Sequence, residues 1–393
     1  MTLVLANPPE GFIEDPWPHY AATREAGITP QPDGSVLLAR YDDLERIYRD
    51  TVRFSSDKRV VFAPKFGEGT PLFRHHTTSL VFNDPPLHTR VRRVMVGALT
   101  PRALGRLQPS LEALVDRLID QMGSEADLIE DFAAAIPVEV IGNLLAIPNE
   151  MRADLRDWSL AILGALEPVP DEVQLARGHR AVWEFSRLLE EVIADRTARP
   201  GNPDEDVLTR LIQAEGAALT GEELVQNCIF ILNAGHETTT NLIGNALWLL
   251  NRWPKERARL VADPALITPA VDEVLRMESP NQLGNRLTTE DVLLHGIEVP
   301  AGTDVHLAIG AANRDPDRFP DPDRFVADRP GNKHLAFGGG PHTCVGLTLA
   351  RLEGRIALER FLARFPAYEV GGGAARSTRL RFRGFTRLPA RLA

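Results

Sequence analysis

One stretch of the sequence, residues 224–250, is apolar on almost every side when it is wound into a helix. A helix on a protein surface shows a single apolar stripe, so a helix that is apolar all round has to be covered by other parts of the chain. The residues Thr-Gly-Glu-Glu at 220–223 form a capping box before the stretch, and Trp253-Pro254 follow it. The pattern predicts one long helix buried through the centre of the protein.

The middle of this helix carries residues that a purely structural helix has no reason to accept. Gly235 costs the helix about 1 kcal/mol relative to alanine, and the three threonines at 238–240 add the penalty of β-branching. We interpret Ala234 and Gly235 as small so that a flat ligand or a substrate can lie against the backbone. Glu237 and Thr238 would bring a carboxylate and a hydroxyl to the same place. The alternative, a solvated polar patch, conflicts with the apolar flanks.

A second stretch, residues 334–346, reads His-Leu-Ala-Phe-Gly-Gly-Gly-Pro-His-Thr-Cys-Val-Gly. The three glycines at 338–340 favour a backbone turn that passes close to a bulky partner. An apolar helical pattern begins directly after Cys344, and a cysteine at a helix N-terminus is favoured as the thiolate that binds metal ions. A lone thiol can instead be a small buried apolar group. Zinc is disfavoured because the only other cysteine, Cys228, lies in a separate apolar run.

The stretch Phe337-Gly-x-Gly-x-His-x-Cys344-x-Gly346 resembles the haem-binding loop of the cytochrome P450 family, the haem-thiolate monooxygenases, at every defined position. Residues 234–238 are similar to the family's oxygen-activating motif, with Glu237 where aspartate is the commoner residue. The resemblance implies the mainly α cytochrome P450 fold with a minor β portion, as a single domain over residues 1–393. It also implies haem b (iron protoporphyrin IX) with Cys344 as the iron ligand.

Two further elements resemble supporting parts of the same family. Glu273 and Arg276 match its Glu-x-x-Arg element, and a second arginine, Arg324 or Arg329, is expected to join them in a buried network that holds the fold around the cysteine loop. His88 and Arg92 are four residues apart, so they share a helix face, and they match one pair of haem propionate ligands. The resemblance assigns to the cofactor His88, Arg92, Ala234, Gly235, Arg286, Phe337, Gly338, His342, Cys344 and Gly346.

The resemblance implies that one oxygen atom from O2 is inserted into a C–H bond of a small apolar substrate, by hydroxylation or O-dealkylation. Glu237 and Thr238 would be the catalytic pair that relays protons during oxygen activation. Two electrons would come from a separate ferredoxin or flavodoxin with its NAD(P)H reductase. Several arginines could form a basic docking surface for that donor: Arg90, Arg93, Arg102, Arg106, Arg351 and Arg355. The alternatives are a peroxide-driven peroxygenase and a non-catalytic haem-binding sensor or carrier.

Composition restricts the class of partner. The chain has 44 Lys and Arg against 54 Asp and Glu, a formal net charge of -10, which argues against nucleic acid and against an anionic membrane surface. Two cysteines are too few for a disulfide framework and favour a reducing compartment. The N-terminal apolar run is too short for a membrane span and breaks at Pro8-Pro9. We expect a cytoplasmic monomer.

Local patterns predict the remaining elements. Helices are expected at 17–26, 41–50 and 204–214, and short strands at 35–39, 285–289, 292–299, 304–309 and 378–385. Residues 60–82 are expected to be irregular because prolines and glycines interrupt them. The phenylalanines of that stretch either close over an apolar ligand or pack the stretch onto the protein.

Overall fold

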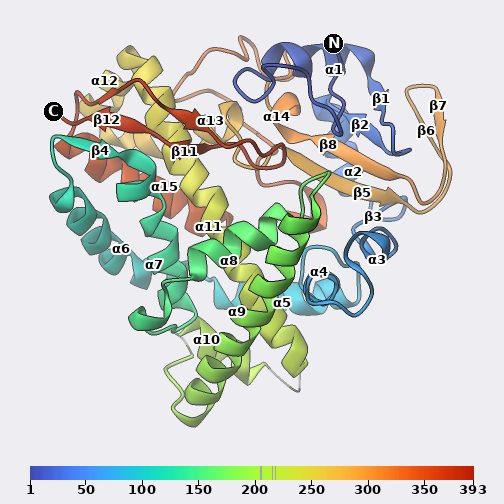
Figure 1. Cartoon of the computed structure of the whole chain (residues 1–393). Helices are drawn as coiled ribbons and strands as arrows, with labels where there is room; N and C mark the ends of the chain where they lie inside the picture. Colours follow the sequence, from blue (N-terminus) through green and yellow to red (C-terminus); the bar gives the residue numbers. More distant parts are fainter. Residues whose placement is uncertain (204–205, 215, 217) are drawn as a thin grey trace. The chain divides into compact units, whose positions relative to one another are not determined.

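The computed structural model describes residues 1–393 except 204–205, 215 and 217, and except the side chains of residues 101 and 102. The fold is mainly α with a minor β portion (Figure 1), as the sequence predicts. Contacts within the chain define two compact units. Unit 1 comprises Met1–Phe54, Ser110–Ile136 and Thr238–Ala393. Unit 2 comprises Ser55–Pro109 and Pro137–Glu237.

The helices account for most of the chain. In the described residues the α-helices are α1 (Trp17–Ala26), α2 (Tyr41–Arg49), α3 (Arg59–Phe66), α4 (Pro71–Thr78), α5 (Leu87–Ala98), α6 (Pro101–Gln121), α7 (Ala135–Leu144), α8 (Leu155–Gly164), α9 (Glu172–Ala198), α10 (Val207–Gln213), α11 (Gly221–Arg252), α12 (Pro254–Ala262), α13 (Ile267–Met277), α14 (Ile309–Ala312) and α15 (Leu347–Arg364). Shorter helical turns are η1 (Leu128–Ala133), η2 (Asn149–Met151), η3 (Pro264–Leu266) and η4 (Gly340–His342).

The strands are short. They are β1 (Ile28–Pro30), β2 (Val36–Leu38), β3 (Phe54–Ser55), β4 (Glu125–Asp127), β5 (Leu283–Thr288), β6 (Val292–Leu294), β7 (Ile297–Val299), β8 (Asp304–Ala308), β9 (Glu369–Val370), β10 (Ala375–Arg376), β11 (Phe385–Arg387) and β12 (Pro389–Arg391). The largest sheet has the order β1-β2-β8-β5-β3, with β2 parallel and β5 antiparallel to β8. The register of β5 places Arg286 opposite Val305, and Figure 1 shows helix α2 beside this sheet.

The long central helix is confirmed as α11. Its predicted capping box is also present, because the amide of Glu223 donates to Thr220 Oγ1 at 3.1 Å and the Glu223 carboxylate accepts from the Thr220 amide at 2.8 Å. Most side chains on both sides of its centre are buried. Within the described part of the chain, every helix is either too short or too polar to cross a lipid bilayer.

Three local predictions differ from the structure. Residues 60–82 are not irregular but contain α3 and α4, and α4 begins with Thr70 as N-cap and Pro71 at its first position, a signal that the proline content obscured. The expected strand at 292–299 is a hairpin, because His295 and Gly296 both have positive φ and form a tight turn. The tail at 378–385 is mostly the connection between the paired strands β10 and β11.

Other local predictions are confirmed. Helices α1 and α2 and strand β2 lie where the sequence predicts them, and α10 covers the described part of the helix expected at 204–214. The phenylalanines of the 60–82 stretch pack against one another: Phe62 lies 5.0 Å from Phe66 and 4.9 Å from Phe82, measured between ring centroids. Because Phe62 and Phe66 are each only 4% exposed, they pack this segment within unit 2.

The core face of α15 carries a buried carboxyl group, Glu353. The side chain is 2% exposed, and its Oε1 has no hydrogen-bond partner among the residues that the structure describes. Burial without a compensating charge raises the pKa of Glu353 to about 8. The group is therefore protonated in the folded protein at neutral pH, whereas it is ionised in the unfolded chain.

Glu353→Gln is expected to stabilise the protein at pH 8 by roughly 2–5 kcal/mol relative to wild type. The folded protein keeps the Glu353 proton up to about pH 8, while the unfolded chain loses it near pH 4 to 5, so the wild-type free energy of unfolding falls through this window. Urea unfolding at pH 5 and pH 8 measures the effect. Glu359→Gln on the same helix is the control, because Glu359 is half-exposed in an ion pair with Arg355 and should change stability by less than about 1 kcal/mol. Equal stability of Glu353→Gln and wild type at pH 8 would contradict the expectation.

Candidate functional site

The cysteine loop is folded back on itself by two backbone hydrogen bonds in unit 1. The amide of Cys344 donates to the carbonyl oxygen of Phe337 at 2.9 Å, and the amide of Gly338 donates to that of Leu335 at 2.8 Å. Gly338 and Gly340 have φ values of 66° and 64°, a region that favours glycine. Cys344 therefore stands at the end of a tight turn, three residues before α15 begins.

Tyr48 of α2 braces this loop and was not predicted from the sequence. A Cβ atom on Gly340 would lie 2.0 Å from the Tyr48 carbonyl oxygen, and one on Gly339 would lie 3.1 Å from Tyr48 Cβ. On its other side, Tyr48 has its hydroxyl against Gly284 and its ring 5.0 Å from the Arg286 guanidinium. Tyr48 thus connects the cysteine loop to β5. Its only sequence signal is an apolar position on an amphipathic helix, which also describes an ordinary core residue.

Phe337 is held from two sides by side chains that share one carboxylate. The Phe337 ring centroid lies 5.6 Å from the His334 ring and 4.9 Å from the Arg351 guanidinium. Asp272 of α13 accepts hydrogen bonds from His334 Nε2 at 3.2 Å and from Arg351 Nε at 2.8 Å. Burial opposes the charge of Asp272, but these two hydrogen bonds outweigh it and lower the pKa of the carboxyl. The start of the loop is therefore tied to α13.

The two cysteines lie in opposite environments. The thiol of Cys344 has intermediate exposure and lies two residues before Gly346, the N-cap of α15. Cys228 in α11 is fully buried, and burial raises the pKa of its thiol to about 12. A thiolate is the form that binds metal, so Cys344 is the better metal ligand of the two. A Cβ atom on Gly346 would lie 3.9 Å from the Cys344 sulfur, so glycine keeps the space beside the sulfur open.

The predicted buried ion-pair network is confirmed in unit 1. Glu273 and Arg276 of α13 are fully buried and are joined by two hydrogen bonds of 2.8 and 2.9 Å. Arg329 Nε donates to Glu273 Oε1 at 2.9 Å, whereas Arg324 takes part through its backbone oxygen, which accepts from Arg329 at 2.6 Å. Of the two arginines that the sequence left open, the structure therefore selects Arg329.

A second buried cluster next to this network was not predicted. Glu278 lies 2.8 Å from Arg383, 3.4 Å from Arg376 and 3.5 Å from Arg314. Burial works against ionisation of Glu278, but the three guanidinium groups together lower the pKa of its carboxyl. These partners are 36 to 105 residues away from Glu278, so no local pattern could have revealed them.

The residues predicted to bind the haem propionates divide between the two units. Arg286 on β5 is 9% exposed and donates to the Asn285 carbonyl oxygen at 2.8 Å, and His342 ends the short turn η4. In unit 2, His88 and Arg92 lie one turn apart on α5, and His88 is buried. The structure therefore confirms that His88 and Arg92 share a helix face. Arg286 and His342 lie on two elements, β5 and η4, that both contact Tyr48.

The centre of α11 carries an accessible stripe in an otherwise buried helix. Phe230, Ala234 and Thr238 follow one another at four-residue spacing, and Ala234 is exposed while the other two are half-buried. Asn233 and Glu237 flank the stripe and are 3% and 5% exposed. A ligand can therefore reach the helix backbone at Ala234, with the Glu237 carboxylate one turn or less away.

Gly235 has a packing role that the sequence did not reveal. A Cβ atom at this position would lie 2.6 Å from Cδ1 of Ile141 on α7. The absence of a side chain therefore lets α7 approach α11, which explains why the helix accepts the cost of a glycine at its centre. The prediction that small size leaves room for a ligand applies better to Ala234.

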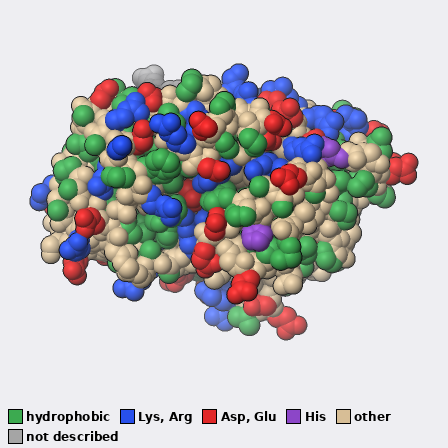
Figure 2. All heavy atoms as spheres, turned by 90° about the horizontal axis from the view of Figure 1, so that it is seen from above, with side chains coloured by type: hydrophobic (Ala, Val, Ile, Leu, Met, Phe, Trp, Pro, Cys, Tyr) green, Lys and Arg blue, Asp and Glu red, His purple; other side chains and the backbone are tan. Residues whose placement is uncertain are grey.

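The predicted basic docking surface remains a prediction, and two of its members are paired with carboxylates. Arg90 is held by Glu223 through two hydrogen bonds of 2.6 and 2.7 Å, and Arg351 is paired with Asp272 at 2.8 Å. The side chain of Arg102 lies outside the described residues. Figure 2 shows basic and acidic side chains interspersed over the face that it displays, without separation by sign.

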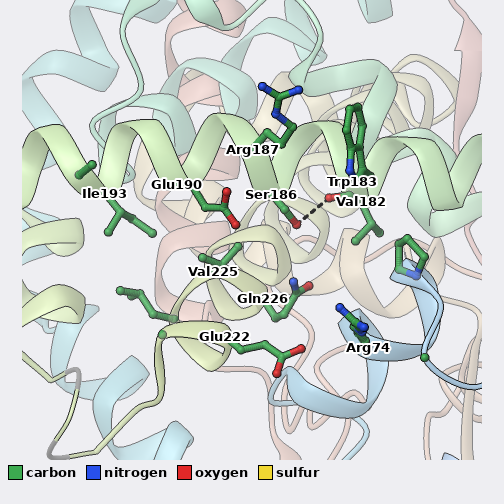
Figure 3. A pocket seen from close by; sticks show the side chains of 15 residues that line it. Arg74, Val182, Trp183, Ser186, Arg187, Glu190, Ile193, Glu222, Val225 and Gln226 are labelled. Atoms are coloured by element: carbon green, nitrogen blue, oxygen red, sulfur yellow. Dashed lines mark hydrogen bonds between the residues drawn. The ribbon is translucent and has the colours of Figure 1, made fainter.

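A groove of about 1040 Å³ lies in unit 2, on α9, the start of α11 and the start of α4 (Figure 3). Trp183 and Arg187 of α9 stand on one wall, and the Arg187 guanidinium lies 5.2 Å from the Trp183 ring centroid. Arg74 comes from α4, and Gln226 comes from the opposite wall on α11. None of the residues predicted for the cofactor or for catalysis lines this groove.

The residues present fit a haem. A half-exposed thiol ends a glycine turn, and an accessible stripe with a neighbouring carboxylate interrupts a buried helix. Together with the mainly α fold, this donor set defines a haem-thiolate oxygenase.

Comparison with known proteins agrees with this class. The family described as "Cytochrome P450" matches residues 162–374. Cytochrome P450 107B1 of Saccharopolyspora erythraea is 38% identical over 97% of this chain and 96% of its own length. The vitamin D(3) 25-hydroxylase of Pseudonocardia autotrophica is 36% identical over 96% and 94%.

Solved structures agree as well. P450BioI, solved with a hexadec-9Z-enoic acid ligated acyl carrier protein, has a TM-score of 0.92 at 31% identity and covers 98% of this chain and 100% of its own. CYP109E1 from Bacillus megaterium, solved with testosterone, has a TM-score of 0.87 at 31% identity and covers 96% and 98%. The chain therefore belongs to the cytochrome P450 family, whose members bind haem b through a cysteine thiolate, and it is a monooxygenase of the bacterial type.

Proposed function

We propose that this protein hydroxylates an apolar small molecule with O2. The reaction consumes R–H, O2, two electrons and two protons, and it yields R–OH and water. Where the oxidised carbon bears an ether oxygen, the same insertion leads to O-dealkylation. The observation that carries the proposal is the half-exposed thiol of Cys344 at the end of the glycine turn. The chain is proposed to act as one haem-binding domain, a cytoplasmic monomer.

Haem binding is assigned residue by residue, as the resemblance implies. The thiolate of Cys344 would ligate the iron, and His88, Arg92, Arg286 and His342 would pair with the propionates, a task that suits the planar fork of arginine. Backbone contact is assigned to Ala234, Gly235, Phe337, Gly338 and Gly346. When bound, a thiolate-ligated haem supplies the iron chemistry that activates O2 for attack on a C–H bond.

Glu237 and Thr238 are proposed to move protons. Glu237 is 5% exposed, and Thr238 follows it on α11 and is half-buried beside the accessible stripe. The carboxylate can take a proton from water and pass it to the Thr238 hydroxyl oxygen, while the hydroxyl gives up its own proton toward the stripe where the substrate would lie. Glutamate reaches further than the commoner aspartate, so its oxygen atoms have more positions from which to deliver the proton.

Thr238→Ala is expected to lower the product formed per NAD(P)H about tenfold or more, while NAD(P)H use continues and hydrogen peroxide accumulates. The reason is that electrons still arrive, but protons are no longer delivered in a controlled way. Product, hydrogen peroxide and NAD(P)H are measured in the same assay. Thr240→Ala removes a neighbouring buried hydroxyl and is the control with unchanged coupling. Unchanged coupling in Thr238→Ala would refute the proton relay.

The electron donor is proposed to be a ferredoxin or flavodoxin with its NAD(P)H reductase.

The assignment of this protein as a haem-thiolate enzyme is tested by the absorption spectrum of its reduced, CO-bound form, in which a Soret band shifted far to the red reports thiolate ligation. Turnover under ¹⁸O2 with a ferredoxin and reductase should place one labelled atom in the product. Product from hydrogen peroxide alone would indicate a peroxygenase, and a lack of any donor-dependent oxygen use would indicate a sensor or carrier.

The substrate class is proposed from the accessible stripe and the relatives. Phe230 and Ala234 make the stripe mainly apolar. One relative is named a vitamin D(3) 25-hydroxylase, and one similar structure was solved with testosterone. We therefore propose that the substrate is an apolar molecule of the kind that vitamin D(3) and testosterone represent.

A further inference from the structure

A chain of buried polar side chains in unit 2 leads from α4 to the accessible stripe of α11. His75 Nδ1 lies 3.1 Å from Oε1 of Gln226, and Nδ2 of Asn233 lies 3.2 Å from His75 Nε2. His75 is 1% exposed, Gln226 is 7% exposed and Asn233 is 3% exposed. Gln226 is also a wall residue of the groove in Figure 3, so the chain runs from the surface toward the helix centre.

The two contacts determine which ring nitrogen carries the proton. An amide oxygen only accepts, so His75 Nδ1 donates to Gln226, and His75 Nε2 accepts from the Asn233 amide group. Burial lowers the pKa of His75 to about 4, so the imidazole is neutral at physiological pH and has no proton on Nε2. The Asn233 amide nitrogen therefore donates to His75, and the Asn233 Oδ1 atom points away from the His75 ring.

The Oδ1 atom of Asn233 is buried and has no hydrogen-bond partner within the described ranges of the chain. A buried acceptor without a partner is costly, and native proteins seldom keep one without a use. Asn233 directly precedes the exposed Ala234, and it lies one turn from both Phe230 and Glu237. The acceptor therefore belongs to a residue within one helical turn of the stripe that is open to a ligand.

We propose that Asn233 is a specificity-determining residue that accepts a hydrogen bond from a hydroxyl group of the substrate, and that His75 is the positioning residue that orients its amide. The inference rests on the proposed function, which places the substrate at the stripe. It narrows the substrate from an apolar molecule to an apolar alcohol.

The test compares an alcohol with its deoxy analogue, in which hydrogen replaces the hydroxyl. Testosterone and its 17-deoxy analogue form one pair, and vitamin D3 and its 3-deoxy analogue form a second. Binding to the haem-loaded enzyme is measured by equilibrium dialysis. In wild type, the alcohol of at least one pair is expected to bind about tenfold or more tightly than its deoxy analogue. Asn233→Leu is expected to bring this ratio to about one by weakening the alcohol alone.

Two further variants separate recognition from structure. Thr240→Val removes another buried hydroxyl without a partner in the described structure from the same helix, and it should leave the ratio unchanged. His75→Phe is expected to lower the ratio because the Asn233 amide loses its anchor. His75→Gln can still accept from Asn233 and donate to Gln226, so it should restore the ratio, which a merely structural role would not require. Haem content and circular dichroism confirm that each variant is folded.

Equal binding of alcohol and deoxy analogue to wild type in both pairs, or no binding of either alcohol, overturns the inference. A ratio that survives Asn233→Leu also overturns it. Dialysis measures binding without turnover. If the alcohol and its deoxy analogue bind equally while the CO spectrum is shifted to the red, the inference on Asn233 fails and the proposed function stands. A missing red-shifted band with the ratio intact would instead refute the proposed function alone.

Discussion

Cys344→Ser is expected to abolish hydroxylation and to remove the red-shifted Soret band of the reduced, CO-bound protein. Serine has nearly the same shape as cysteine, but its hydroxyl is not ionised near neutral pH, so it cannot supply the negative sulfur ligand. The turn that presents residue 344 should survive, because its hydrogen bond to Phe337 is made by the backbone amide. The expected result is a folded protein that forms no product above background.

The other cysteine provides the matched control. Cys228→Ala removes a thiol that is fully buried in α11, so it should keep both the red-shifted band and turnover. Spectra of both variants are recorded at equal haem content, with product measured by mass spectrometry. Retention of the red-shifted band in Cys344→Ser, or its loss in Cys228→Ala, would show that the sulfur of residue 344 is not the iron ligand.

Glu273→Gln is expected to lower the free energy of unfolding by roughly 3–5 kcal/mol. Glu273 accepts hydrogen bonds from Arg276 and Arg329 in a fully buried position, so the neutral amide leaves two guanidinium groups without a counter-charge. Such a loss of stability arises from the cost of an unpaired buried charge, not from the strength of the original pair.

Urea unfolding followed by circular dichroism measures this effect at constant haem content. Glu45→Gln is the control, since Glu45 makes a surface pair with Arg49 at 2.9 Å, in which the two side chains are 37% and 70% exposed. That change should cost no more than about 0.5 kcal/mol. A loss below about 1 kcal/mol in Glu273→Gln would mean that the network is not needed for stability.

Much of the candidate site could be predicted from the sequence because its signals are local. The glycine turn before Cys344 and the small residues within α11 depend on conformational preferences of adjacent residues, which one stretch of sequence expresses by itself. The i, i+4 spacing of His88 and Arg92 is likewise a property of a single helix. The same holds for the capping box at Thr220 and for the pairing of Glu273 with Arg276.

Local signals failed where competing patterns overlapped. Prolines and glycines in 60–82 suggested irregular structure, but Pro71 stands at the first position of α4, where proline is well tolerated. The run 292–299 alternates like one strand, yet His295 adopts a left-handed conformation beside Gly296 and turns the chain into a hairpin. In both cases the residue type permits two conformations, and packing of the surrounding chain selects one.

The sequence by itself determined the family, the thiol of Cys344, the long apolar helix and the charged pair of α13, because each depends on residues close together in the chain. Only the tertiary structure decided that Arg329 completes the network, that Tyr48 braces the cysteine loop and that His75 holds the amide of Asn233. These contacts join residues that are far apart in the chain: Arg329 and Glu273 are 56 positions apart, and Asn233 and His75 are 158 positions apart. Contacts over such separations depend on how helices and strands pack, which no local propensity expresses.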